Sequence, residues 1–164
     1  MKLSMTARKG LVTLHIVFSA IMLGNMVTFL LLSIVSVTTA EDRLLESCYA
    51  IMHVLSETSI RASTIGTTIT GILLSIWTKW GLFKYKWIIV KEIITVLLIV
   101  LNIWGMYGLT LNALNEIKVT SIFIDPPLGL WAGIILQLVS LIFIFAISVY
   151  KPWGQRKQGI SFTK

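Results

Sequence analysis

The chain has 164 residues, of which 56% are hydrophobic and only 13% are charged, and its net charge at neutral pH is +7. Charged residues make up about a quarter of an ordinary soluble domain, so this composition, with a mean hydropathy of +0.88, argues against a water-soluble fold. The excess of lysine and arginine is explained by membrane topology and contact with anionic lipid headgroups, and it does not indicate a nucleic-acid-binding protein.

The first predicted element is the apolar run Leu11–Val37, which exceeds the roughly 20 residues that a helix needs to cross ~30 Å of hydrocarbon. It is also far longer than the ~7 to 15 apolar residues of a signal peptide, so we expect it to stay in the mature protein as a transmembrane helix. The residues before it carry Lys2, Arg8 and Lys9. By the positive-inside rule they lie in the cytoplasm.

The segment after this span predicts an additional short helix at the outer surface. Between Leu44 and Leu55 the apolar residues recur at helical spacing, and the segment is too long for a tight turn. The sequence leaves two arrangements open. The short helix either bends away from the next span or continues into it as one rod from Leu44 to Trp77, about 50 Å long.

The next stretch reads SETSIRASTIGTTITG at Ser56–Gly71 and is unusually polar for a membrane span. The charges of the connecting segments nevertheless require a crossing there. Residues 1–10, 78–86 and 151–164 are basic, whereas residues 37–50 and 110–127 are net acidic. Only a span between Ser56 and Trp77 places all three basic segments on one side of the membrane, with both termini in the cytoplasm.

Two further apolar runs, Trp87–Leu111 and Leu128–Tyr150, complete the predicted elements. The sequence therefore predicts one all-α integral membrane domain over residues 1–164, in the plasma membrane. It is a four-transmembrane-helix bundle with spans at about 11–37, 56–77, 87–111 and 128–150. Cys48 is the one cysteine of the sequence, which excludes an internal disulfide and a multi-cysteine metal site.

Each predicted span has polar residues along one side of its helix. At about 100° per residue the aligned positions are His15, Ser19, Met22 and Ser33 on the first span, with Asn25 beside them; Glu57, Arg61, Thr64, Thr68, Gly71 and Ser75 on the second; Lys91, Thr95, Asn102 and Gly105 on the third; and Gly133, Gln137 and Ser148 on the fourth. Because polar side chains are costly in lipid, we expect these sides to face the interior of the bundle.

The polar residues fall at two heights, and the outer layer consists of Asn25, Arg61, Asn102 and Gln137. At 1.5 Å per residue these four lie about 20 to 24 Å above the inner boundary. Glu57 stands four residues before Arg61 and can pair with it on the same helix, either for structure alone or for function. We predict a ligand pocket between the outer-layer residues, opening toward the outer face, because one glutamate cannot satisfy four large polar side chains.

The inner layer lies within about 8 Å of the inner boundary and consists of His15, Ser75, Lys91 and Ser148. Lys91 either contributes to the ligand site or extends its stem to the cytoplasmic headgroups. His15 is either a core histidine bonded to a hydroxyl or carbonyl, or an axial ligand to haem or copper with Met22 on the same side. His53 lies more than ~20 Å away in height, so the two histidines cannot share a ligand.

Three strings resemble the small bacterial integral membrane proteins grouped around the copper-resistance protein D type. They are LHIVFSAIMLG in the first span, WTKWGLFKYKWIIVKEI between the second and third spans, and VYKPWG at the end of the fourth. The resemblance covers most of the chain and implies that His15, Gly24, Trp87 and Lys91 are the positions of interest. The sequence has no Met-rich or multi-histidine motif of the kind that carries copper.

Three classes of function follow. The first is a ligand-binding or redox membrane protein, with haem or a metal at His15, or an anionic or quinone-like small molecule at Arg61. The second is a small transporter or channel, with Glu57 as a proton carrier. The third is an accessory or scaffold subunit of a membrane complex, formed with a membrane partner or as a homo-oligomer. An enzyme is less favoured, because the sequence has no phosphate loop, metalloprotease motif or nucleophile elbow. The expected partners are the lipid bilayer and a small molecule, and no cofactor beyond the haem option is indicated.

Overall fold

The computed structural model describes residues 4–77, 85–120 and 128–152. Its regular elements are all helices: α1 (Met5–Thr38), α2 (Asp42–Leu55), the π-helical turn η1 (Ser56–Ile60), α3 (Arg61–Trp77), α4 (Lys86–Val100), the π-helical turn η2 (Leu101–Met106), α5 (Tyr107–Thr120) and α6 (Leu128–Tyr150). The basic connection at 78–84, part of the acidic connection at 110–127 and the basic tail after Pro152 lie outside these residues.

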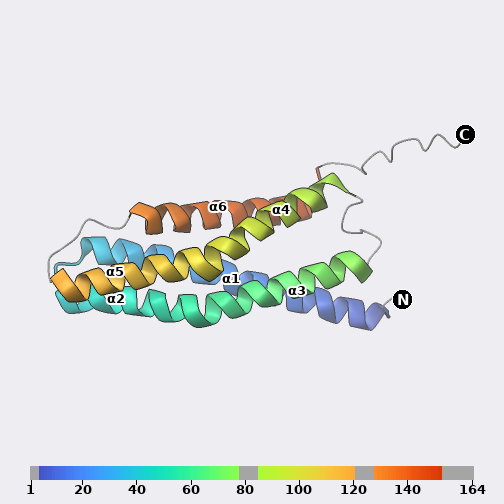
Figure 1. Cartoon of the computed structure of the whole chain (residues 1–164). Coiled ribbons are helices and arrows are strands. Elements are labelled where there is room, and N and C mark those ends of the chain that lie inside the picture. The colour runs from blue at the N-terminus through green and yellow to red at the C-terminus, as the bar shows by residue number, and fades with distance from the viewer. Residues whose placement is uncertain (1–3, 78–84, 121–127, 153–164) are drawn as a thin grey trace, which may run out of the picture.

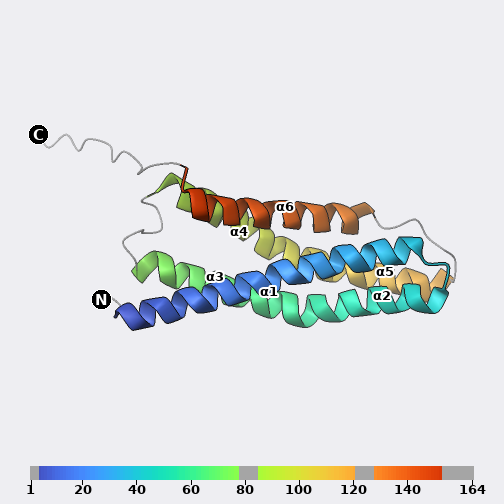
Figure 2. The same ribbon diagram turned by 180° about the vertical axis from the view of Figure 1, so that it is seen from behind.

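The helices run side by side along one long axis (Figures 1 and 2). One end of the bundle holds the start of α1, the end of α3, the start of α4 and the end of α6, and we call it the inner end. At the other end, which we call the outer end, α2 and α5 extend beyond the shorter α6 (Figure 1). The helix predicted at the outer surface is thus packed lengthwise between α1 and α5.

The segment Asp42–Trp77 is one continuous rod, which answers the question that the sequence left open about the extra helix. Leu55 and Ser56, at the end of α2, both keep right-handed helical backbone angles, so the chain passes through η1 into α3 without a break in the helix. No glycine or proline interrupts residues 42–65 to stop the helix. At 1.5 Å per residue the rod is about 54 Å long.

Three helical segments are long and apolar enough to cross a membrane: Met5–Thr38, Lys86–Ile117 and Leu128–Tyr150. Large apolar side chains cover their outward surfaces, and on α6 Leu136, Val139 and Ile142 are each more than half exposed. A water-soluble protein seldom exposes so continuous an apolar surface. The structure therefore has the character of a membrane protein.

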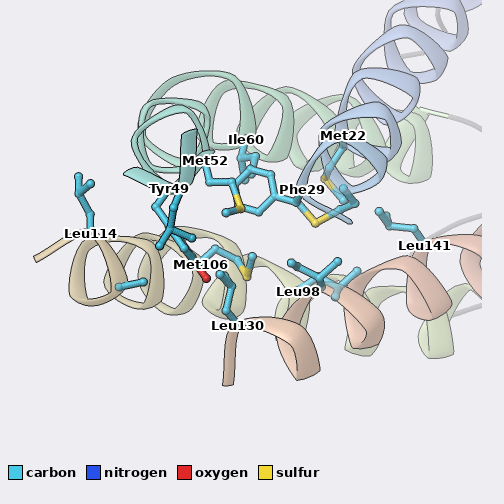
Figure 3. Close-up of a cluster of buried hydrophobic side chains, with 14 residues drawn as sticks. Met22, Phe29, Tyr49, Met52, Ile60, Leu98, Met106, Leu114, Leu130 and Leu141 are labelled. Carbon is cyan, nitrogen blue, oxygen red and sulfur yellow. The ribbon is translucent and has the colours of Figure 1, made fainter. Parts of the chain in front are cut away.

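Sulfur-containing and aromatic side chains fill the middle of the bundle (Figure 3). Met26, Phe29, Met52 and Met106 are at most 1% exposed and belong to one hydrophobic cluster. Unbranched methionines fill irregular spaces between helices that cross at different angles. This cluster closes the centre of the bundle between its two ends.

A glycine allows α1 and α3 to approach closely near the inner end. The ring of Phe18 packs directly against Gly66, so closely that a Cβ added at Gly66 would lie only 2.7 Å from three ring carbons. Small residues permit such close approach of helices in membranes. The contact fixes the part of α3 that carries the threonine-rich side.

The polar sides of the helices point inward, as the sequence pattern predicts for most of the aligned residues. Ser19, Asn25 and Ser33 of α1 are buried, as are Thr64 of α3, Asn102 of η2, and Gly133 and Gln137 of α6. Several hydroxyls donate to the carbonyl four residues earlier in their own helix, for example Thr68 to the Thr64 oxygen at 2.7 Å. Such bonds satisfy a hydroxyl without a partner from another helix.

Candidate functional site

A cavity of about 540 Å³ lies between α1, α3, α4 and α6 in the inner half of the bundle. Most of its wall is apolar, with side chains such as Ile72, Val96 and Leu141. The polar groups in the wall come from all four helices and include His15, Thr68, Ser75, Lys91, Glu92 and Ser148.

The polar side of α3 forms one wall of this cavity. Thr64, Thr68, Gly71 and Ser75 all line it, at the spacing of three and four residues that places them on one side of a helix. Their side chains are short, which leaves space between α3 and α4. At Gly71 a Cβ would lie 3.3 Å from Cε1 of His15, so the glycine gives the imidazole room.

Lys91 reaches across the cavity wall to α6. Its Nζ donates to the Ser148 hydroxyl at 2.7 Å, and that hydroxyl in turn donates to the Ile144 carbonyl at 2.7 Å. The ammonium also lies 5.8 Å from the centre of the Trp87 ring. The side chain is thus held by a helix of the bundle, and the positive charge lies at the wall of the cavity.

His15 is held by a hydroxyl of α3. Its Nδ1 lies 2.9 Å from the Thr70 hydroxyl oxygen, and that hydroxyl is 2.7 Å from the Gly66 carbonyl oxygen. Hydroxyl bonding was one of the two alternatives for His15. If Thr70 donates to the carbonyl, Nδ1 of His15 carries the proton, and if Thr70 donates to Nδ1, the proton is on Nε2. In both tautomers the bond fixes the imidazole against α3, in the wall of the cavity.

The charge balance of the cavity wall is positive. Among the described residues, Arg8, Lys91 and Lys151 line it, against the carboxylate of Glu92. One carboxylate oxygen of Glu92 is buried without a hydrogen-bond partner. The sequence reasoning did not include Glu92 among the site residues, although a second charge beside Lys91 inside an apolar run was the available signal.

The outer-layer residues do not line this cavity, and they separate into two pairs. The Asn25 amide donates to the Ser59 hydroxyl at 2.9 Å, which joins α1 to η1. The Gln137 amide donates to the Asn102 carbonyl oxygen, which joins α6 to η2. Of the four side chains predicted to surround one pocket, Asn25, Asn102 and Gln137 thus bond to neighbouring helices, although the remaining Gln137 oxygen is buried without a partner.

Arg61 has an aromatic neighbour in place of the predicted carboxylate. Its guanidinium carbon lies 4.6 Å from the centre of the Tyr107 ring, whereas Glu57 is exposed. Within the described part of the chain no ion pair joins Glu57 to Arg61. The physical reason is η1: Glu57 lies within this π turn, whose wider spacing shifts it away from the side of the helix that carries Thr64 and Thr68.

The two histidines lie in different parts of the bundle, and His53 bonds through Nδ1 to the Thr110 hydroxyl at 3.3 Å. In the described ranges no three His, Cys, Asp or Glu side chains are close enough together to hold a metal ion. The thioether of Met22 accepts a bond from Thr64 at 3.6 Å. Met22 and His15 both line the cavity, and the described residues place no cluster of three imidazole, thiolate or carboxylate ligands beside them.

No protein-family model, no curated protein and no solved structure matches this chain. The resemblance to the copper-resistance protein D type therefore stays a prediction from the short strings of the sequence.

Proposed function

We propose that this chain is a four-span bacterial inner-membrane protein that binds an amphipathic ligand, with the anionic head of the ligand beside Lys91. The observation that carries the proposal is the cavity of about 540 Å³ with an apolar wall and a lysine directed into the bundle. Sites for small molecules are commonly concave, mostly apolar and about 300 to 1,000 Å³ in volume, with a few oriented polar groups.

The ligand class follows from the charges and the hydrogen-bonding groups. Lys91 and Arg8 offer positive charge to an anionic group, and the imidazole of His15 offers a hydrogen-bonding group, or a ligand to iron. The apolar wall suits a hydrocarbon or ring body. Haem and a fatty acid both have this amphipathic, anionic form, and His15 would hold the first through its iron. A quinone-like molecule is neutral and would instead accept a hydrogen bond from Lys91 through a carbonyl oxygen.

The arrangement of the helices supports four crossings. α3 packs lengthwise against α1 (Figure 2). A helix packed along its length on a membrane-crossing helix crosses with it. The polar side of α3 faces the cavity, which lowers the cost of its threonines and serines in lipid. With both termini cytoplasmic, the cavity lies in the inner half of the membrane.

Binding is favoured over transport by the filled centre of the bundle. Met22 and Leu98 belong both to the cavity wall and to the hydrophobic cluster that closes the middle (Figure 3). A path through the bundle would have to pass Phe29, Met52 and Met106, which are fully buried. A scaffold role alone does not require a cavity of this volume, because packed helices commonly leave few voids larger than water.

The test is to purify the full chain in mild detergent, record its absorbance spectrum, and extract and identify bound molecules by mass spectrometry. We expect an amphipathic anion at near one molecule per chain, with a Soret band if it is haem. Lys91→Gln should lower the occupancy on the order of tenfold, since charge-assisted bonds are among the strong ones. Lys86→Gln removes an exposed lysine of the same helix and is the matched control. Equal occupancy in both variants would contradict the site.

Topology is tested separately with reporter fusions. Fusions at Arg43 and Lys118 should report the outer side, and a fusion at Lys84 should report the cytoplasm. An outer location of Lys84 would overturn the four-span arrangement.

A further inference from the structure

A second polar cluster lies away from the cavity, where η1 and the start of α3 face α5. The guanidinium of Arg61 stacks on the Tyr107 ring with 4.6 Å between the guanidinium carbon and the ring centre. The ring of His53 lies 5.1 Å from the same tyrosine ring. His53 and Ser56 both contact the Thr110 hydroxyl, so these two side chains are held in place by α5.

Arg61 carries a positive charge without an acceptor for its hydrogen bonds. Its Nε is buried and has no partner, and no carboxylate forms an ion pair with it among the described residues. Glu57, one turn earlier, is exposed. A guanidinium has five donors in one plane, and stacking on an aromatic ring uses its face while leaving those in-plane donors to bind an anion.

The height of Arg61 indicates where this anion would lie. Arg61 is 16 residues from Trp77 at the inner end of the rod, which corresponds to about 24 Å along the helix and places it near the outer boundary of ~30 Å of hydrocarbon. Trp104, one turn before Tyr107 on the neighbouring rod, is 68% exposed. Exposed tryptophan is typical of the membrane interface, where the phosphates of phospholipids lie within reach of a long arginine side chain.

We propose that Arg61, stacked on Tyr107, forms a phosphate-binding site at the outer end of the bundle. The planar guanidinium binds two oxygens of one phosphate in parallel, an arrangement that arginine makes and lysine does not. The phosphate belongs either to the headgroup of an outer-leaflet phospholipid or to a free phosphate ion. The site is distinct from the cavity, since neither Arg61 nor Tyr107 lines it.

The experiment uses the full-length protein in a neutral detergent, titrated in one arm with dioctanoyl phosphatidylglycerol and in the other with inorganic phosphate. The readouts are the shift of the thermal unfolding midpoint and the adducts seen in native mass spectrometry. Arg61→Gln should weaken binding on the order of tenfold. Arg43→Gln removes an exposed arginine of the same rod and should leave binding unchanged.

The two arms separate the source of the phosphate. Binding of the lipid at concentrations where inorganic phosphate has no effect assigns the site to a headgroup, and equal effects of both assign it to a free anion. If Arg61→Gln unfolds, two variants that keep the positive charge replace it. Arg61→Lys tests the need for a planar guanidinium, and Tyr107→Leu tests the need for the aromatic stack. Both should bind more weakly, whereas Tyr107→Phe should bind as the unmodified chain does. Unchanged binding in Arg61→Lys and Tyr107→Leu, or no Arg61-dependent binding of either probe, would overturn the proposal.

Discussion

The close contact between Phe18 and Gly66 predicts a large effect of a single methyl group. In Gly66→Ala the new Cβ would lie 2.7 Å from three carbons of the Phe18 ring, well inside van der Waals contact. The ring or the helix must move, and overpacking of this kind costs about 1 to 3 kcal/mol. Gly24→Ala is the matched control, because nothing lies within 4 Å of the Cβ that it would add on α1.

Equilibrium unfolding of both variants in the same detergent measures the difference. We expect Gly66→Ala to lose stability and Gly24→Ala to keep or gain up to about 1 kcal/mol, since alanine favours helix over glycine. Phe18→Leu combined with Gly66→Ala should recover part of the loss, with a coupling energy of about 0.5 to 3 kcal/mol. If Gly66→Ala is as stable as Gly24→Ala, α1 and α3 do not pack as described, and the cavity wall that they form would be in doubt.

Two further predictions concern buried groups elsewhere. Burial raises the pKa of the Cys48 thiol, and its side chain is only 2% exposed. Less thiolate is therefore present at neutral pH, so maleimide should label Cys48 slowly, and the rate should increase as the pH rises. The control is a cysteine at the exposed position Ser47 in a Cys48→Ser background, which should label fast. Equal labelling rates of the two cysteines would contradict the packing of α2. Gln137→Leu should cost about 1 to 3 kcal/mol of unfolding free energy, because the buried Asn102 loses its donor. The double variant with Asn102→Leu should recover stability in the same unfolding assay. A double variant less stable than both single variants would refute the hydrogen-bonded pair.

The inward polar sides could be predicted from the sequence because helix periodicity alone fixes them. Thr64, Thr68, Gly71 and Ser75 repeat at helical spacing within α3, and no irregular turn interrupts them. Lys91 and Ser148 were placed at one height by counting residues, and the structure joins them by a hydrogen bond. Periodicity and rise per residue thus predicted most of the polar wall of the cavity.

The location of the cavity could not be predicted, because it depends on how polar groups pair across helices. Asn25 bonds Ser59, and Gln137 bonds Asn102, so the outer residues are drawn into separate contacts. The π turns η1 and η2 rotate one part of each rod against the other, which a helical wheel of constant period does not represent. For this reason Glu57 was expected beside Arg61 in the interior and is exposed instead.

Tyr107 is the neighbour of Arg61 that the sequence reasoning missed. The residue lies on another rod, directly after η2, and no spacing rule connects it to the second predicted span. The general preference of a buried guanidinium for an aromatic face was the available physical signal. This preference predicts that the partner is aromatic, but only the fold determines which aromatic residue it is.

The central claim is that an amphipathic anion occupies the cavity between α1, α3, α4 and α6. An experimental density map of the full chain, purified from membranes without added ligand, tests it most directly. We predict elongated density in the cavity, with one end within hydrogen-bonding distance of Nζ of Lys91 and the rest along the apolar wall. A cavity that holds only separate water molecules, or that is closed by side chains of the bundle, would contradict the claim.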